Sequence, residues 1–298
     1  MRKINNILSE ITPNMYRCTI KKKATIVDTD KGCFVLKERT GNNIKDVYDY
    51  LKSRSFEYYP GLIKFDDRYN VYEYIEDINT PIDQKAFDMM YILSLLHNKT
   101  TFFKELDIDE YKALYEDLTN KVEEVNSYYT NLINGIERTV YMSPSQYLIA
   151  RSISEIYGAL YYSKTELDNW YELVKDNNKK RIVTLYNNND INHLIRNESL
   201  YLINWENSKI ENPIYDMYDF YKKYALDFDF LDLLDYYEQQ YPLLEEEKKL
   251  LFIMISIPEK VIFTDNEFEN CKSAKNIVDY VFKTGSLILP KKEFETTE

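Results

Sequence analysis

Apolar and polar residues alternate in short runs over the first eighty residues, a period typical of strands with one buried face. Residues 28–32 lie between two such runs and predict a turn, in which Gly32 is free to adopt a positive φ. A short helix over residues 43–53 interrupts the series. We therefore expect a small β-rich lobe over residues 1–78 with five strands. The predicted strands span residues 16–20, 24–27, 33–37, 61–65 and 70–74.

After Pro81 the apolar positions recur at intervals of three and four residues, which predicts amphipathic helices. Ser143 followed by Pro144 matches an N-cap residue with proline at the first helical position, and it predicts one helix continuing to Leu160. The other predicted helices cover residues 87–97, 111–132, 170–174, 215–237, 242–256 and 271–282.

Two short apolar runs interrupt this helical pattern. Residues 181–185 and 200–203 have strand character and predict a β-hairpin near residues 181–204. The sequence therefore predicts a large helical lobe over residues 79–290 that holds a hairpin, followed by a polar tail over residues 291–298.

The charge of the chain narrows the possible partners. A formal net charge of −12 argues against nucleic-acid binding through a general basic surface, because phosphate contacts need clustered Lys and Arg. The basic run Lys21–Lys23 fits a solvated turn, with a small anion-contacting patch as the alternative. No apolar run reaches the roughly 18 to 20 residues of a membrane span, and no apolar signal core follows the first charges. We expect a cytoplasmic protein that binds no membrane.

Cysteine and histidine usage argues against a structural metal. The three cysteines are an odd number without paired spacing, which suits a reducing compartment. His97 and His193 are the only histidines, so the sequence has no Cys/His framework for zinc. His97 ends an apolar helix and is expected to be a hydrogen-bonded structural residue.

The residues around the predicted hairpin carry the clearest motifs. Residues 186–195 read Tyr-Asn-Asn-Asn-Asp-Ile-Asn-His-Leu-Ile, residues 203–206 read Ile-Asn-Trp-Glu, and residues 212–217 read Asn-Pro-Ile-Tyr-Asp-Met. This order resembles the aminoglycoside phosphotransferase and choline kinase superfamily. There, a His-Gly-Asp-x-x-x-x-Asn-apolar-apolar loop precedes an Ile-Asp-Trp/Phe-Glu motif and a Pro-x-x-Asp-apolar motif. Leu-Leu-His-Asn-Lys-Thr at residues 95–100 is similar to the spore coat protein S branch of that superfamily.

The resemblance implies a role for each loop position. It places Asn188 at the catalytic base, Tyr186 at the loop histidine, His193 at the metal-binding asparagine and Asn204 at the metal-binding aspartate. In a working phosphotransferase the base accepts the proton of the substrate hydroxyl, and the other two residues hold Mg²⁺ against the phosphates. An amide has no useful basicity, and Mg²⁺ prefers hard anionic oxygens. We therefore predict a degenerate site that holds no metal, which is the condition of a pseudokinase.

A second register makes Asp190 the base. The residue five positions after Asp190 is then Ile195, which cannot bind metal. A remodelled loop would have to use His193, three positions after Asp190, as the metal ligand. Asn204 stays neutral in this register. Under this alternative the protein is a divergent phosphotransferase that uses ATP and Mg²⁺ on a sugar-like, choline-like or aminoglycoside-like substrate.

Lys37 is the candidate nucleotide-binding residue. The strand Phe-Val-Leu-Lys that ends at Lys37 resembles the superfamily's nucleotide-contacting strand, and a solvated lysine at a strand end is the alternative. Gly32 is the only glycine between Cys18 and Lys37, so a glycine-rich phosphate loop is missing. The helix at residues 43–53 offers Asp46 and Asp49 in place of the glutamate that usually pairs with this lysine.

The resemblance implies an α+β, protein-kinase-like, two-lobed fold, with a small β-rich N-lobe and a large helical C-lobe. Asp216 matches the aspartate that braces the catalytic loop, a structural role. We predict a non-catalytic protein with a binding or scaffolding role, no cofactor, and a protein or small-molecule partner that the sequence does not identify. The spore coat is its location if the branch resemblance extends that far. The alternatives are the phosphotransferase, with ATP and Mg²⁺, and an unrelated α+β protein whose Ile-Asn-Trp-Glu run is a coincidence.

Overall fold

The structure is a computed structural model that describes residues 15–21, 24–106 and 109–288. The expected polar tail and two lysines of the basic run, Lys22 and Lys23, lie outside these ranges. The chain forms two compact units. The first unit contains the residues up to Thr100 and Thr184–Lys209, and the second contains Thr101–Val183 and the residues from Ile210 onward. The lobe boundary expected near residue 78 stays a prediction.

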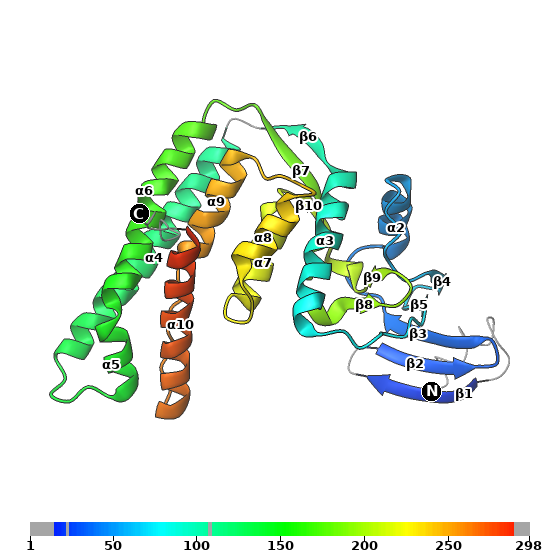
Figure 1. Cartoon of the computed structure of the whole chain (residues 1–298), viewed down its shortest axis with the longest axis horizontal. Coiled ribbons are helices and arrows are strands. Elements are labelled where there is room, and N and C mark those ends of the chain that lie inside the picture. The colour runs from blue at the N-terminus through cyan, green and yellow to red at the C-terminus, as the bar shows by residue number, and fades with distance from the viewer. Residues whose placement is uncertain (1–14, 22–23, 107–108, 289–298) are drawn as a thin grey trace, which may run out of the picture. The chain divides into compact units, whose positions relative to one another are not determined.

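A five-stranded antiparallel sheet begins the first unit, as the alternating pattern predicts (Figure 1). Gly32 has a φ of 114° in the turn between the second and third strands, a conformation that costs glycine little. On the third strand, Lys37 lies opposite Ala24 on one side and Asn70 on the other. The strands in spatial order are β1 (Met15–Lys21), β2 (Ala24–Thr29), β3 (Gly32–Glu38), β5 (Tyr69–Glu73) and β4 (Leu62–Phe65).

One face of this sheet is buried because its inward positions are apolar. Val27, Phe34, Leu36 and Val71 form a buried cluster contributed by β2, β3 and β5. Burial of such side chains contributes roughly 1.5–3 kcal/mol each relative to exposure. The cluster thus holds the register that carries Lys37 on β3.

The rest of the first unit consists of two helices and a small hairpin. Thr100 links the last turn of its longer helix to the chain at Thr184, whose backbone N–H donates to the Thr100 hydroxyl over 3.0 Å. His97 is completely buried on the same helix. The elements are α2 (Ile44–Ser53), α3 (Ile82–Thr100), η1 (Ile191–His193), β8 (Leu194–Arg196), β9 (Leu200–Leu202) and η2 (Trp205–Asn207).

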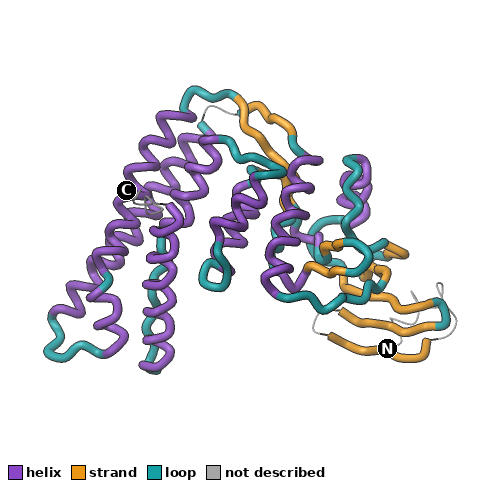
Figure 2. The backbone as a smooth tube through the Cα atoms, viewed as in Figure 1, coloured by secondary structure: helices purple, strands orange, loops and turns teal. Residues whose placement is uncertain are grey.

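The second unit is mainly helical (Figure 2). Its helices are α4 (Glu110–Glu137), α5 (Pro144–Arg151), α6 (Ile153–Val174), α7 (Ile214–Tyr224), α8 (Phe230–Glu238), α9 (Glu245–Ser256) and α10 (Glu267–Ile288). Helix α6 packs against both α4 and α9, and α10 packs on α5 (Figure 1). A helix of the length and apolarity needed to cross a membrane is not found in the part of the chain that the structure describes.

Three expectations from the sequence need correction. The helix predicted from residue 144 to 160 is two helices, because the backbone leaves the helical region at Ser152, with φ −112° and ψ 16°. The helix predicted over residues 215–237 is also interrupted, and Asp229 caps the start of α8 by accepting a hydrogen bond from the Leu231 N–H. The N-cap predicted at Ser143 is confirmed, with a capping box to Gln146.

The third correction concerns strand partners. The hairpin in this part of the chain is formed by β8 and β9, which pair with each other. The apolar run at residues 181–185 belongs to β7 (Lys179–Leu185), which lies between β10 (Lys209–Glu211) and β6 (Phe102–Glu105). Both partner strands are short, and the sequence pattern did not reveal them.

Candidate ligand-binding site

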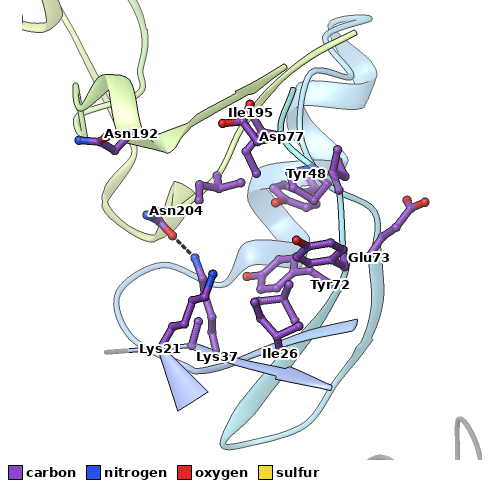
Figure 3. Close-up of a pocket in the computed structure, with 16 residues that line it drawn as sticks. Lys21, Ile26, Lys37, Tyr48, Tyr72, Glu73, Asp77, Asn192, Ile195 and Asn204 are labelled. Carbon is purple, nitrogen blue, oxygen red and sulfur yellow. Dashed lines mark hydrogen bonds between the residues drawn. The ribbon is translucent and has the colours of Figure 1, made fainter. Parts of the chain in front are cut away.

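A cavity of about 370 Å³ lies within the first unit (Figure 3). This volume is in the range typical of small-molecule sites. Apolar side chains from the sheet and from the segment after η1 face it, together with tyrosines from α2 and β5. Its lining residues include Ala24, Ile26, Val35, Lys37, Tyr48, Tyr72, Tyr74, Ile75, Ile195, Ile203 and Asn204.

The protein leaves the backbone polar groups of Ile75 without a hydrogen-bond partner among the described residues. Ile75 follows β5 and lines the cavity. Backbone groups that the protein leaves unsatisfied must bind water or a ligand.

Lys37 occupies the polar end of the cavity. Its Nζ donates a hydrogen bond to Oδ1 of Asn204 (Figure 3). The same Nζ lies 3.9 Å from Oε1 of Glu206. Only 16% of the Lys37 side chain is exposed. Burial lowers the pKa of Lys37 below its ordinary value, and the charge of Glu206 opposes that effect. Burial, reinforced by Glu206, also raises the pKa of Tyr72, whose ring centroid is 5.8 Å from Nζ.

The loop at residues 186–193 brings three of the predicted site residues together. The Asn188 side-chain N–H donates to the backbone carbonyl of Asn204 over 3.0 Å. The ring Nδ1 of His193 lies 3.3 Å from the backbone carbonyl of Asn188. Of the predicted residues, only Lys37 and Asn204 line the cavity itself.

Tyr186 anchors the start of this loop. Its hydroxyl donates to the backbone carbonyl of Ile203, and its ring meets Trp205 edge-on with centroids 5.1 Å apart. The next residue, Asn187, has a φ of 52°, a left-handed conformation that asparagine tolerates better than most residues. Tyr186 therefore holds the loop against the Ile-Asn-Trp-Glu segment.

Asp190, the alternative base, has a capping role. Its carboxylate accepts hydrogen bonds from the backbone N–H of Asn192 at 2.9 Å and from the Asn192 side chain at 2.8 Å. Asp190 is thus the N-cap residue of η1, the short helix that ends at His193. Asn192, and not Asp190, lines the cavity.

Two further predicted residues are buried in helices. Asp216 is completely buried on α7 in the second unit, and His97 is completely buried on α3 in the first. Burial of a charge or a ring nitrogen requires polar partners, so both fit structural positions. The bracing role of Asp216 stays a prediction.

Glu206 and Gly41 are site residues that the sequence analysis missed. The partner of Lys37 was sought on the helix at residues 43–53, but the nearest carboxylate comes from Glu206 in the Ile-Asn-Trp-Glu motif. Gly41 has a φ of 68°, and a Cβ there would lie 2.3 Å from the carbonyl oxygen of Glu206. The same carbonyl accepts the backbone N–H of Asn42 over 2.9 Å. The Ile-Asn-Trp-Glu motif contains Glu206 and could have indicated it as a site residue. The contact between Gly41 and Glu206 joins residues too distant in sequence to be predicted from the sequence.

The residues at the polar end do not fit a magnesium ion. Mg²⁺ requires octahedral oxygen ligands and is usually bound through carboxylates. The Asn204 side-chain oxygen already accepts from Lys37, and the carboxylate of Glu206 lies 3.9 Å from the same ammonium group. Among the described residues, no cluster of three or more His, Cys, Asp or Glu side chains is placed to hold a metal.

Solved structures define the class of fold. An aminoglycoside phosphotransferase from Alicyclobacillus acidocaldarius subsp. acidocaldarius DSM 446 matches with a TM-score of 0.66 at 10% identity, covering 92% of this chain and 90% of that one. The AMP-bound complex of a spectinomycin phosphotransferase gives 0.56 at 12% identity, covering 94% and 98%. A choline kinase from Streptococcus pneumoniae gives 0.51 at 17% identity, covering 93% and 98%.

These matches show that the chain has a protein-kinase-like, two-lobed α+β fold, with a small antiparallel sheet followed by a large helical part. Within that class, the fold is the one shared by aminoglycoside phosphotransferases and choline kinases, as the motifs predict. At these identities the likeness concerns the fold and not the activity. No protein-family model and no curated protein sequence matches the chain.

Proposed function

We propose that this chain is a non-catalytic kinase-fold protein that binds a flat ligand in the Lys37 cavity without Mg²⁺. One observation carries the proposal. Both amides that the predicted register places at the carboxylate positions, Asn188 and Asn204, are engaged within the protein, one with a backbone carbonyl and one with Lys37.

The chemistry of these amides opposes phosphoryl transfer. Asn188 cannot accept a proton from a hydroxyl, and general-base catalysis is worth roughly 10² to 10⁴ in rate. A neutral Asn204 oxygen is a weak ligand for Mg²⁺, which neutralises the charge that develops during phosphoryl transfer. Losing the base and an anionic metal ligand together removes the two main contributions of the protein to the reaction.

The cavity supports a ligand that carries a purine ring. Aliphatic side chains of Ile26, Val35, Ile195 and Ile203 line it, and the free peptide groups of Ile75 can bind the edge of a ring. A spectinomycin phosphotransferase of the same fold forms a complex with AMP. A purine ring between aliphatic surfaces satisfies both the apolar lining and the peptide groups.

A thermal-shift titration with adenosine and with ATP, each with and without Mg²⁺, tests this function. A ligand at 100 times its Kd stabilises the folded state by about 2.7 kcal/mol, which raises the melting temperature by a few degrees. We expect stabilisation that Mg²⁺ does not increase. Val35→Phe, which fills the apolar end, should abolish the shift, whereas Ile63→Phe at an exposed position of β4 should retain it. No shift with either ligand, or a shift that requires Mg²⁺, would contradict the proposal.

The divergent phosphotransferase remains the second candidate, because Asp190 is a carboxylate within the loop at residues 186–193. Its Oδ1 oxygen accepts two hydrogen bonds from Asn192, which lowers the availability of that oxygen as a base. A binding or scaffolding role in a spore coat and a cytoplasmic location stay predictions from the motif resemblance.

A further inference from the structure

We propose that Lys222, on α7 of the second unit, is a site of acylation by activated acyl groups of the acyl phosphate and thioester classes. This inference is independent of the Lys37 cavity and of the proposed ligand-binding function. It rests on the surroundings of the Lys222 amine, which remove it from water without placing a carboxylate in hydrogen-bond contact with it. A lysine that is desolvated in this way reacts as a free amine.

Two aromatic rings and a neutral carbonyl surround the amine of Lys222. Its Nζ lies 4.7 Å from the ring centroid of Tyr280 on α10 and 5.9 Å from that of Tyr218 on α7. It donates a hydrogen bond to the backbone carbonyl of Ile257 over 3.3 Å. The carboxylate of Glu259 lies 3.8 Å away, which is longer than an ordinary N–H···O hydrogen bond. The protein therefore gives the ammonium group less stabilisation than water would.

These surroundings favour the neutral amine at a mildly alkaline pH. Only 17% of the Lys222 side chain is exposed. Burial lowers its pKa to about 8, the charge of Glu259 opposes that effect, and the charge of Lys121 adds to it. About half of the Lys222 side chains are therefore neutral at pH 8, against less than about 1% for a lysine at its ordinary pKa. Burial raises the pKa of Tyr218 and of Tyr280, so neither hydroxyl contributes a charge in this range.

The end of the Lys222 side chain lies close to the surface. Glu259, whose carboxylate is 3.8 Å from Nζ, has a side chain that is 72% exposed. A small acyl donor can therefore approach the amine from the side of Glu259. The Tyr129 hydroxyl donates to the backbone carbonyl of Glu259 over 2.6 Å, and the Tyr128 hydroxyl donates to that of Val261. These bonds hold the segment after α9 against α4, so Glu259 stays beside Lys222.

The proposed reaction is an acyl transfer to nitrogen. The neutral Nζ attacks the carbonyl carbon of the acyl group, and a C–N bond forms. The bond from that carbon to the phosphate oxygen or to the thioester sulfur breaks, so phosphate or thiolate leaves, and the proton on nitrogen passes to water. The amide product is uncharged and keeps one N–H for the carbonyl of Ile257. Acylation therefore removes a charge that burial destabilises.

Reaction of the full chain with acetyl phosphate tests this inference. Peptide mass spectrometry measures the rate of acetylation at each lysine between pH 6.5 and 9.5. Lys180 is the matched control, because its side chain is 12% exposed and burial pulls its pKa down, but hydrogen bonds to Glu110 and Glu211 raise that pKa above the ordinary value. Lys164, which is 59% exposed, controls for access. At pH 8 we expect Lys222 to react at least about tenfold faster than either control, because its fraction of neutral amine is about a hundredfold that of a lysine at its ordinary pKa.

The pH dependence of the rate separates an activated amine from ordinary surface reactivity. The rate at Lys222 should reach half its maximum near pH 8, whereas the rate at Lys180 should still be rising at pH 9.5. Glu259→Gln removes the charge that favours the ammonium form, so the rate at Lys222 at pH 7 should rise, by up to about fivefold. The inference is overturned if Lys222 reacts no faster than Lys164, if its rate keeps rising up to pH 9.5, or if Glu259→Gln slows the reaction.

Discussion

Each compact unit contains a buried ion pair, and the two pairs differ in how completely their hydrogen bonds are satisfied. In the second unit, Arg181 donates to both oxygens of Glu247, with Nε 3.0 Å from Oε1, and also to the carbonyl of Pro242. Its guanidinium lies 4.4 Å from the ring centroid of Tyr241. In the first unit, Lys37 has a neutral amide as its hydrogen-bond acceptor and a carboxylate 3.9 Å away.

The difference separates a structural charge from a charge in a ligand site. Burial pulls the pKa of Arg181 down, but the hydrogen bonds and charge of Glu247 raise it above its ordinary value. For Lys37 burial prevails and the pKa is lowered. The protein therefore stabilises the charge of Arg181 and destabilises that of Lys37, which faces the cavity.

Breaking the structural pair should produce the largest effect. Arg181→Met leaves Glu247, whose side chain is 2% exposed, as an uncompensated buried charge. We expect a loss of about 3–5 kcal/mol in the free energy of unfolding, measured by urea denaturation. Lys175→Met, which removes a surface pair with Glu172, is the control and should cost less than about 1 kcal/mol. Equal effects of the two substitutions would remove the distinction between the pairs.

Lys222 extends the comparison to a buried lysine outside the cavity. Burial lowers its pKa to about 8, against the pull of Glu259, and its Nζ lies 4.7 Å from the ring centroid of Tyr280. The unfolded chain, with a pKa near the ordinary 10.5, binds more protons between these values, so stability rises with pH in that window.

The stability difference between the unmodified protein and Lys222→Met should therefore change by about 2 kcal/mol between pH 7 and 9.5, in favour of the unmodified protein at the higher pH. Denaturation at several pH values measures it. A difference that stays constant across this range would show that Lys222 is not destabilised by burial.

Removing Lys37 should have the smallest effect on stability. Lys37→Met relieves the cost of burying the ammonium group, and Glu206, 3.9 Å away, loses a charge contact that is too long for a hydrogen bond. We therefore expect a change of at most about 1 kcal/mol in either direction. Urea denaturation beside Arg181→Met checks it. A loss of 3 kcal/mol or more would mean that Lys37 is a structural cation like Arg181.

The sheet was predictable because period-two patterning and Gly32 act locally. Ser143 was predictable for the same reason, since its cap involves Gln146 three residues away. The break at Ser152 was not predictable, because apolar spacing continues through it. The pairing of β7 with β6 and β10 depends on segments brought together only by the fold.

The same distinction between local and long-range contacts applies to the candidate site. Motif spacing named Lys37 and Asn204 as site residues, and the structure brings them into contact within the cavity. It did not reveal Glu206 as the neighbour of Lys37, nor the packing of Gly41 against it, because these contacts join the loop after β3 to a segment more than 160 residues later. The sequence indicates which residue types belong to the site, whereas the charge that faces Lys37 is set by tertiary contacts.

Phosphoryl transfer from labelled ATP by the unmodified protein is the most direct test of the central claim that the site is non-catalytic. The assay includes excess Mg²⁺ and offers choline, sugars and aminoglycosides as acceptors. We predict the same rate of transfer and of phosphate release with and without the protein. Magnesium-dependent turnover that Asp190→Ala abolishes would contradict the claim and identify Asp190 as the base of a working phosphotransferase.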